Sequence, residues 1–223
     1  MQILRYAELA ASPWKNGGGI TREVLRHPKS GAFSWRLSLA EVGQSGPFSE
    51  FAGYRRIMML LQGHGLRLQA EGLEDQVLLE VGALVEFPGA QRTHCELIDG
   101  PCVDLNLMFR ESLPAPAVQV LDAAALREGR AVRATAGGRG GPGGRGGVLV
   151  AVALGDGDLS LEGTHESHAP ALRLGRWDTA VLAPEDGERR LVAEGARAGA
   201  VAGAAMGSGA SRCAAMLLAL EYA

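Results

Sequence analysis

The sequence of 223 residues lacks the features that mark nucleic-acid-binding, membrane and secreted proteins. Its formal net charge is −3 and its isoelectric point is near 6.0, which gives no sign of a dedicated nucleic-acid or membrane binder. Its apolar runs are short and interrupted by glycine, well below the roughly 20 residues that a membrane-spanning helix needs. Its first residues show no signal-peptide pattern. We therefore expect a soluble cytoplasmic protein with no nucleic acid and no membrane among its partners.

Cysteine is also scarce, and the common catalytic motifs are missing. Cys95, Cys102 and Cys213 are scattered and form no Cys-x-x-Cys pair. We interpret them as small core residues in a reducing compartment. The sequence contains no Gly-x-Ser-x-Gly nucleophile elbow and no phosphate loop ending in Gly-Lys-Ser/Thr. Neither nucleophilic catalysis nor nucleotide binding is predicted, and no cofactor is expected.

What the sequence does contain is the stretch Ser12–Glu23, in which Trp-Lys-Asn precedes three consecutive glycines. Glycine permits positive φ and a close approach to another backbone or a ligand, at an entropic cost. Thr21 and Glu23 are two residues apart, so they point to the same face of a strand. One interpretation is a polar pocket with this loop at its rim. The other is a simple turn between two strands, with Trp14 plugging the core.

Short alternating segments dominate the first half of the chain. Phe33–Val42 alternates apolar and polar residues, Arg56–Leu61 is mostly apolar, and Cys102–Arg110 alternates again. Such segments, separated by Gly and Pro at regular intervals, are typical of antiparallel sandwiches and barrels. Only Asp122–Glu128 has a helical pattern. The sequence therefore predicts an all-β protein.

The second half shows weak sequence similarity to the first, as after an internal duplication. Ile57–Gly65 is similar to Val150–Gly157, and Cys102–Leu107 is similar to Cys213–Leu218. This internal similarity predicts two tandem antiparallel β-barrels of the jelly-roll kind. We place the first barrel in residues 1–115 and the second, with its Gly-rich loops at 136–147 and 195–211, in residues 116–223.

The two copies differ in polarity along one strand. Asp104 and Asn106 share a face in the first copy, where the second has Ala215 and Leu217. A barrel interior filled by apolar groups is structural, whereas one lined by polar groups can hold a ligand. We therefore expect the binding site in the first barrel and a scaffolding role for the second.

Three strands of the first half carry polar residues at a spacing of two. A single pair of this kind is common on a solvent-facing strand, but three pairs beside further cations and amides indicate a shared lining. Buried charges must be paired or hydrogen-bonded, so we expect Arg36, Arg56 and Lys15 to pair with Glu23 and Asp104. Arginine also offers the carboxylate of a ligand a bidentate fork. We predict that a small-molecule carboxylate binds to Lys15, Asn16, Thr21, Glu23, Arg36, Ser38, Arg56, Asp104 and Asn106.

A cupin-type metal site is the main alternative, with His64, His94, His165 and His168 as candidate ligands. No His-x-His pair exists, and His165 and His168 lack the spacing of two by which strand ligands converge. We therefore predict no metal. An enzyme that uses Glu23 and Asp104 as acid and base stays open, and so does a protein-interaction module that acts through the loops.

The Gly/Arg/Pro tract at 136–147 has two interpretations. An RGG-type segment would bind RNA. A flexible loop needs only small and polar residues. Because the tract holds only Arg139 and Arg145 as cations and has no aromatic residue, we favour the flexible loop.

Taken together, the motifs of the first half closely resemble those of the HutD/Ves family. The resemblance covers Trp14 to Arg110 and rests on four segments that occur in the family's order: Trp14–Glu23, Trp35–Ala40, Gly46–Arg56 and Asp104–Met108. The second half matches only in its general pattern. At one position the chain departs from the family, because Arg55 stands where an acidic residue usually precedes the arginine.

The resemblance implies a bicupin fold without the usual metal-binding histidines. It also implies an association with bacterial histidine utilisation, in which HutD proteins are thought to bind a metabolite such as formylglutamate or urocanate and to limit flux. No enzymatic activity is firmly attached to the family. Carried over to this chain, the family's pocket comprises the nine polar residues named above.

Overall fold

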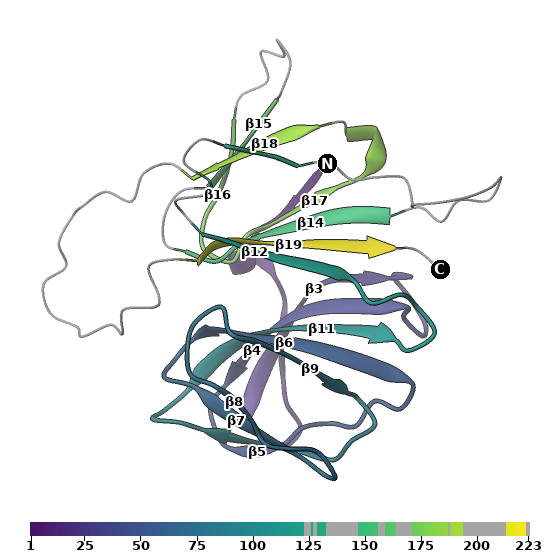
Figure 1. The fold of residues 1–223 in the computed structure, drawn as a ribbon, viewed down its shortest axis with the longest axis vertical. Helices are drawn as coiled ribbons and strands as arrows, with labels where there is room; N and C mark the ends of the chain where they lie inside the picture. Colours follow the sequence, from purple (N-terminus) through teal and green to yellow (C-terminus); the bar gives the residue numbers. More distant parts are fainter. Residues whose placement is uncertain are drawn as a thin grey trace, which may run out of the picture. The chain divides into compact units, whose positions relative to one another are not determined.

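The computed structural model describes residues 1–122, 126, 129–132, 147–155, 159–163, 171–186, 188–193 and 213–221. The chain divides into two compact units. The first unit is Leu9–Ala115, and the second unit is Met1–Glu8 together with Pro116–Ala223 (Figure 1). Most of the predicted helix at 122–128, nearly all of the tract at 136–147, the stretch at 195–211, and His165 and His168 lie outside the described residues.

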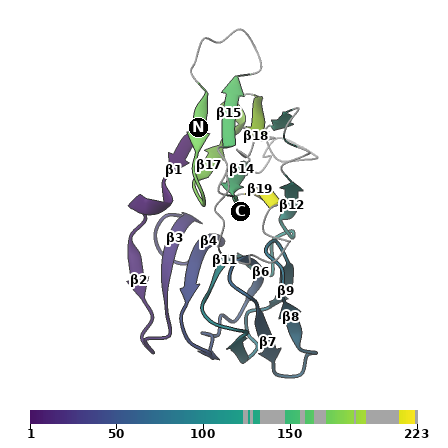
Figure 2. The ribbon, with the colours of Figure 1, turned by 90° about the vertical axis from the view of Figure 1, so that its left-hand side faces the viewer.

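The first unit consists of a six-stranded and a four-stranded antiparallel sheet. The six-stranded sheet has the order β2-β3-β4-β11-β6-β9, with β2 at Ala11–Pro13, β3 at Gly19–His27, β4 at Trp35–Val42, β11 at Cys102–Arg110, β6 at Tyr54–Gln62 and β9 at Leu84–Pro88 (Figure 2). The four-stranded sheet has the order β5-β10-β7-β8, with β5 at Gly46–Pro47, β10 at Thr93–Leu97, β7 at Leu66–Ala70 and β8 at Gln76–Leu78.

Both faces of the central strands of the six-stranded sheet are buried. On β11 the apolar Leu105, Leu107 and Phe109 lie on one face, and each is at most 1% exposed. The other face turns toward the interior of the unit, where one cluster of apolar side chains packs. Asp104 belongs to this interior face, because strand residues two apart share a side. The predicted alternation of β11 therefore directs its polar residues inward.

The second unit repeats the two-sheet arrangement. Its five-stranded sheet has the order β1-β17-β14-β19-β12, with β1 at Gln2–Leu4, β17 at Thr179–Leu182, β14 at Gly147–Ala153, β19 at Cys213–Glu221 and β12 at Ala117–Asp122. Its four-stranded sheet has the order β13-β18-β15-β16, with β13 at Arg130–Val132, β18 at Arg189–Ala193, β15 at Leu159–Gly163 and β16 at Leu172–Leu174. Short 3-10 turns occupy Tyr6–Glu8 and Pro184–Asp186.

The two units share one strand topology. Strands β4 to β11 form the orders β4-β11-β6-β9 and β5-β10-β7-β8, and strands β12 to β19 form β12-β19-β14-β17 and β13-β18-β15-β16. Each set of eight therefore makes the same connections in the same chain order. The registers also agree, because Asp104 pairs with Leu60 and Ala215 pairs with Ala153. The internal similarity seen in the sequence thus corresponds to a repeated topology.

Two details differ from the prediction. The described strands form open sheets, so each unit is a pair of sheets and no closed barrel is seen in this part of the chain. Met1–Glu8 had been placed with the first unit, but β1 pairs antiparallel with β17 and thereby joins the second. Within the described residues the all-β prediction holds, and no helix there is long and apolar enough to cross a membrane.

Candidate functional site

Strand register brings the polar pairs of three strands onto one face of the six-stranded sheet. Glu23 on β3 pairs with Ser38 on β4, and Ser38 pairs with Asn106 on β11. One row further along, Thr21 pairs with Ala40, and Ala40 pairs with Asp104. Because these residues sit at even spacings on each strand, they project to the same side of the sheet.

A cavity of about 640 Å³ opens over this face. All nine residues predicted from the sequence line it: Lys15, Asn16, Thr21, Glu23, Arg36, Ser38, Arg56, Asp104 and Asn106. The sequence prediction did not include the other residues of the lining, which are Ser12, Pro13, Trp14, Ala40, Pro47, Phe48, Ser49, Phe51 and Met108. Ligand sites of small molecules typically have volumes of about 300–1,000 Å³, so this cavity has a suitable size.

Arg56 is the most deeply buried cation of the cavity, with 6% of its surface exposed. Its guanidinium lies 5.1 Å from the centre of the Phe48 ring and 4.9 Å from that of Phe87. Its Nε has no hydrogen-bond partner among the described residues. Burial lowers the pKa of Arg56 to about 10, against the opposing attraction of Asp104. Aromatic faces thus hold this cation where a carboxylate partner would be expected.

Arg36 lies in the same row of the sheet as Arg56. Both pair with Met108 of β11, Arg36 from β4 and Arg56 from β6. The Arg36 guanidinium also stacks on aromatic rings, 5.1 Å from the centre of Phe33 and 5.4 Å from that of Phe51. Burial lowers the pKa of Arg36, while nearby Glu23 raises it. The sheet therefore presents two guanidiniums to the cavity, one from each of the strands that flank Met108.

Asp104 and Asn106 supply buried acceptors on β11. Asp104 is 1% exposed, and neither of its carboxylate oxygens has a hydrogen-bond partner among the described residues. Asn106 is 7% exposed and its side-chain Oδ1 is likewise unpartnered in this part of the structure. Burial raises the pKa of Asp104 to about 7, although the Arg56 guanidinium lowers it. Because such oxygens are costly to bury without donors, a ligand that donates hydrogen bonds would be favoured here.

The loop with three glycines connects β2 to β3 and forms part of the cavity rim. The indole Nε1 of Trp14 donates to the hydroxyl of Thr21 at 2.8 Å, and the backbone N–H of Gly18 donates to Oδ1 of Asn16 at 3.1 Å. Lys15 and Asn16 are exposed. Trp14 packs against the core of the unit and lines the cavity. Both interpretations of this loop therefore apply, because it is a turn between strands and also a wall of the cavity.

The ion pairs expected within the site do not form. Sequence reasoning paired Arg36, Arg56 and Lys15 with Glu23 and Asp104. In the described residues Glu23 instead lies 4.0 Å from Arg26, and no carboxylate lies within ion-pair distance of Arg36 or Arg56. The aromatic rings that replace these partners belong to loops and to a neighbouring strand. The Gly-Pro-Phe-Ser segment signals the loop, but no periodicity shows where its ring points.

The histidines of the described residues do not gather at the cavity. His94 lies on β10 between buried Thr93 and Cys95, so its exposed side chain points away from the interior. His64 is exposed in the turn between β6 and β7, where its Nδ1 is 2.9 Å from the carbonyl oxygen of Asp99. No group of three or more His, Cys, Asp and Glu side chains suited to a metal ion occurs in this part of the chain.

Cys95 and Cys102 are poor nucleophiles. Cys95 and Cys102 are buried in the interior of the first unit. Burial is the main reason that the pKa of each thiol is raised to about 12, and nearby Asp104 adds to the effect. Since the thiolate is the reactive form, both behave as small apolar core residues.

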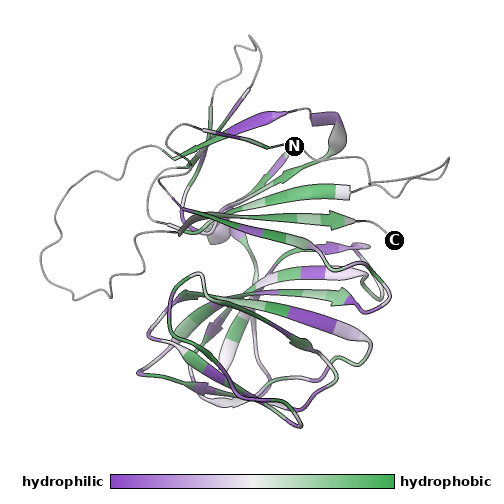
Figure 3. Cartoon of the chain, in the orientation of Figure 1, coloured by the Kyte–Doolittle hydropathy of each residue, from purple (hydrophilic) through white to green (hydrophobic). Residues whose placement is uncertain are grey.

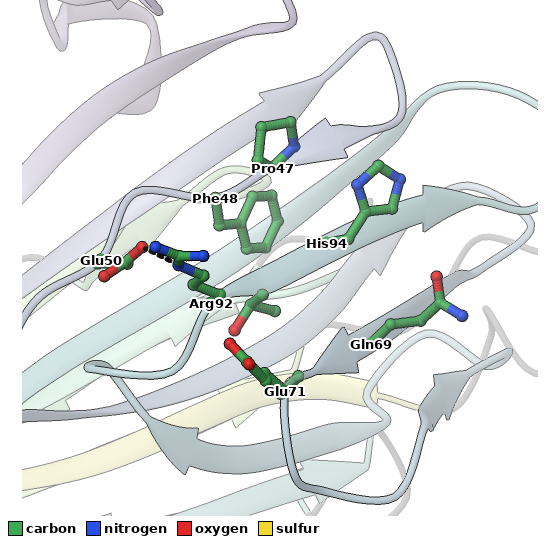
Figure 4. A pocket seen from close by; sticks show the side chains of 9 residues that line it. Pro47, Phe48, Glu50, Gln69, Glu71, Arg92 and His94 are labelled. Carbon is green, nitrogen blue, oxygen red and sulfur yellow. Dashed lines mark ion pairs between the residues drawn. The ribbon is translucent and has the colours of Figure 1, made fainter.

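A second hollow of about 410 Å³ lies on the outer side of the four-stranded sheet (Figure 4). It shares Pro47 and Phe48 with the first cavity. An ion pair of 3.5 Å between exposed Arg92 and Glu50 borders it, and the exposed His94 and Gln69 extend from paired positions on β10 and β7 (Figure 4). Exposed ion pairs contribute about 0–1 kcal/mol, so these side chains are weakly organised. The first cavity is the better candidate site.

The second unit lacks the polar lining at the equivalent positions. Asp104, Asn106 and Arg56 correspond by register to Ala215, Leu217 and Leu149. Ala215 and Leu217 are buried in the apolar core of that unit. Strand β14 is green along most of its length in Figure 3, whereas a purple segment interrupts β6. Among the residues that the structure describes, these polar lining positions therefore occur in the first repeat and are apolar in the second.

This chain is similar to known proteins in sequence and in structure. An uncharacterised 21.2 kDa protein from the hutC 3′ region of Pseudomonas putida is 43% identical over 111 residues, which cover 49% of this chain and 58% of that protein. Protein Ves of Cronobacter sakazakii is 31% identical over 123 residues, 55% of this chain and 67% of that protein. The aligned region thus spans little more than half of the first of these relatives.

Solved structures extend the likeness to the whole chain. HutD from Pseudomonas fluorescens SBW25 has a TM-score of 0.72 and 26% identity, covering 100% of this chain and 99% of that one. Ylba from E. coli, at 12% identity and a TM-score of 0.63, shares the fold over 99% of this chain and 90% of that one. The sequence model described as HutD matches residues 6–200. The chain therefore belongs to the HutD family.

Proposed function

We propose that this protein binds a small metabolite that bears a carboxylate, in the cavity of its first unit. The observation that carries the proposal is the pair of arginines, Arg36 and Arg56, which share one row of the sheet. Arg56 is buried and Arg36 is partly buried, their positive charges repel each other, and neither has a carboxylate within ion-pair distance among the described residues. A planar anion between them would supply the bidentate contacts that guanidinium favours.

The remaining residues of the cavity set the orientation of the ligand. Ser38 and Asn106 lie beside the arginines on β4 and β11. Lys15 and Asn16 lie at the rim, where an extra cation attracts the anion during entry. Phe48 and Phe51 hold the guanidiniums in place through their ring faces. This division of roles matches a typical site, which has an apolar wall and a few directed polar groups.

Formylglutamate and urocanate are the ligands that we propose, because both carry a carboxylate and belong to histidine utilisation. Support comes from the relative in the hutC 3′ region and from family membership. A HutD structure obtained in a formate condition makes formate a useful minimal probe. We assign the protein a regulatory role in the cytoplasm, and we interpret each unit as a jelly-roll barrel of a bicupin.

The test is a thermal-shift screen of the full chain against formate, glutarate, urocanate and N-formylglutamate. A ligand at one hundred times its dissociation constant stabilises the folded state by about 2.7 kcal/mol, which moves the melting temperature by several degrees. Arg36→Ala should abolish the shift. Arg55→Ala is the matched control, because Arg55 is exposed and paired with Glu86 on the same strand pair. If no carboxylate shifts the melting temperature, or if Arg36→Ala keeps the shift, the proposal is wrong.

One observation favours an enzyme as the second candidate. The pKa of Asp104 is raised to about 7 by burial, which is the range of an effective general acid or base. An exposed Glu23 lines the same cavity. Incubation of each ligand that binds with the protein, followed by NMR of the small molecule, separates the two candidates. An enzyme would convert its ligand at a rate that Asp104→Asn lowers, whereas a binding protein would leave the ligand unchanged.

A further inference from the structure

The unpartnered polar atoms of the cavity fall into two groups of opposite character. Three acceptors lie on β11: the two carboxylate oxygens of Asp104 and the Oδ1 of Asn106. Two donors lie on the flanking strands, and these are the Nε groups of Arg36 on β4 and Arg56 on β6. Asp104, Asn106 and Arg56 are each more than nine-tenths buried, and all three line the cavity.

Strand register separates these two groups along the sheet. The arginines pair with Met108, whereas Asp104 pairs with Ala40 and Leu60. Met108 and Asp104 are four residues apart on one strand, but the Arg56 guanidinium is still close enough to lower the pKa of Asp104, so a small ligand can reach both rows. The cavity therefore has a donor end at the row of Met108 and an acceptor end at the row of Asp104, and Asn106 lies between them.

A ligand with only a carboxylate would satisfy the guanidinium donors at one end of the cavity. It would destabilise the buried Asp104 carboxylate at the other end. Its negative charge would satisfy the guanidiniums but leave the Asp104 carboxylate buried without a donor, near a second anion. A ligand that also carries an N–H group would donate to Asp104 and satisfy both ends. Hydrogen bonds to charged groups contribute more than neutral ones, so this second contact would add selectivity.

We propose that the ligand is bipolar, with a carboxylate held by Arg36 and Arg56 and an N–H group that donates to Asp104 and Asn106. This inference rests on the proposed function and narrows its ligand to carboxylates that bear an N–H donor a few bonds away. Simple carboxylates such as formate and glutarate then fill only the donor end of the cavity. N-acylated amino acids and carboxylates with an N–H heterocycle fill both ends.

The test compares two probes that differ in one atom. N-formylglutamate carries an amide N–H, and 2-(formyloxy)glutarate has an ester oxygen in its place. Isothermal titration of the full chain should show that the amide binds roughly 10- to 100-fold more tightly, which is the range for a hydrogen bond to a charged group. In Asp104→Asn the preference should fall to within about threefold, because a neutral amide oxygen is a weaker acceptor.

Asp99→Asn is the matched control, because Asp99 is exposed in the same unit and has a φ of 54°, which asparagine tolerates. It should keep the preference of the unaltered protein. Equal affinities for the two probes would overturn the inference and leave the proposed function intact, and so would a preference that Asp104→Asn does not reduce. If none of the carboxylates binds, both proposals are wrong.

A pH titration of the unaltered protein covers the case in which Asp104→Asn does not fold. The titratable groups that act on Asp104 are Arg56 on β6, Cys95 on β10 and Cys102 on its own strand. Only Asp104 among these changes its charge near neutral pH. From pH 6 to pH 8 the affinity for N-formylglutamate should rise, because ionised Asp104 accepts its N–H. The affinity for 2-(formyloxy)glutarate should fall, and parallel pH profiles for the two probes would overturn the inference.

Discussion

Asp104 and Arg56 line the same cavity with opposite formal charges, yet they form no ion pair in the described structure. The register explains the separation, since Arg56 pairs with Met108 and Asp104 pairs with Leu60 two rows along the sheet. Their charges still interact, because each shifts the pKa of the other. The cavity is therefore lined by two buried ionisable groups that the fold holds apart.

The first prediction concerns the stability of the Asp104→Asn variant at different pH values. Burial raises the pKa of Asp104 from 3.8 to about 7, so between these values the folded chain keeps a proton that the unfolded chain has lost. The free energy of unfolding must then fall as the pH rises through this window, by up to about 4 kcal/mol. Asp104→Asn removes this contribution, so its stability should depend less on pH.

Urea denaturation of both proteins between pH 4 and pH 8 measures this difference directly. The stability of the unaltered protein relative to Asp104→Asn should be highest near pH 4 and lowest near pH 8. Asp99→Asn, at an exposed aspartate, should follow the unaltered protein across the whole range. A stability difference that stays constant with pH would show that Asp104 titrates as an ordinary carboxyl.

The second prediction separates function from stability at Arg56. Burying a charged group costs several kcal/mol, and in the described residues Arg56 has no carboxylate within ion-pair distance to offset that cost. We expect Arg56→Met, measured at pH 6 where Asp104 is mostly protonated, to unfold at an equal or higher urea concentration. The same variant should lose carboxylate binding altogether.

Arg55→Met serves as the control for this prediction on the neighbouring residue. Arg55 is exposed and its ion pair with Glu86 contributes about 0–1 kcal/mol, so both stability and binding should change little. If Arg56→Met is destabilised by several kcal/mol, the guanidinium supports the fold through its two aromatic contacts. Such a result would remove the argument that Arg56 is kept for a ligand.

Much of the lining was predictable because strand side chains alternate with a period of two. Once β3, β4 and β11 were expected as strands, Thr21 and Glu23, or Asp104 and Asn106, had to share a face. Register between strands is a tertiary property, yet a buried face specifies it strongly. The polar pairs could therefore be predicted to meet, although their partners across the sheet could not be named.

The aromatic wall of the cavity was not predictable in the same way. Phe48 and Phe51 lie outside the long strands, and Phe87, which stacks on Arg56 from outside the lining, comes from β9 at the edge of the sheet. The direction of a loop side chain depends on tertiary contacts, such as the hydrogen bond from the Phe48 N–H to the carbonyl of Thr93 at 2.8 Å. The sequence therefore indicated ion pairs where the structure has cations stacked on rings.

The third prediction ranks the three consecutive glycines by what an added Cβ would meet. At Gly19 it would lie 2.6 Å from the carbonyl oxygen of Glu41 and 3.1 Å from the Trp14 ring, so backbone must move. At Gly17 there is open space, but φ is +72°. At Gly18 the closest atom is Oδ1 of Asn16 at 3.4 Å, an ordinary contact.

We expect Gly19→Ala to be the most destabilising of the three substitutions and Gly18→Ala to be nearly neutral. Gly17→Ala should cost about 1 kcal/mol, because an L-residue is strained at positive φ. Differential scanning calorimetry of the three variants measures the order of their losses in stability. Equal losses of stability at all three positions would contradict the prediction. They would show that only the number of glycines in the loop matters, and not the close approach of β4 to Gly19.

The last prediction tests whether the hydrogen bond between Trp14 and Thr21 fixes the rim of the cavity. The indole Nε1 donates to the Thr21 hydroxyl at 2.8 Å across the turn that joins β2 to β3. Trp14→Phe removes the donor and keeps a ring, and Thr21→Val removes the acceptor at nearly constant volume. A double-mutant cycle of these two changes should give a coupling of about 1 kcal/mol in the free energy of unfolding.

The same cycle should be measured on the affinity for the carboxylate probe that binds. Trp14 lines the cavity and also contacts Phe48 edge-to-face, with ring centres 5.9 Å apart, and Phe48 in turn covers Arg56. Loss of the hydrogen bond should therefore loosen the wall beside Arg56 and weaken binding several-fold. Coupling in stability without coupling in binding would mean that the turn supports the fold while the arginines keep their positions unaided.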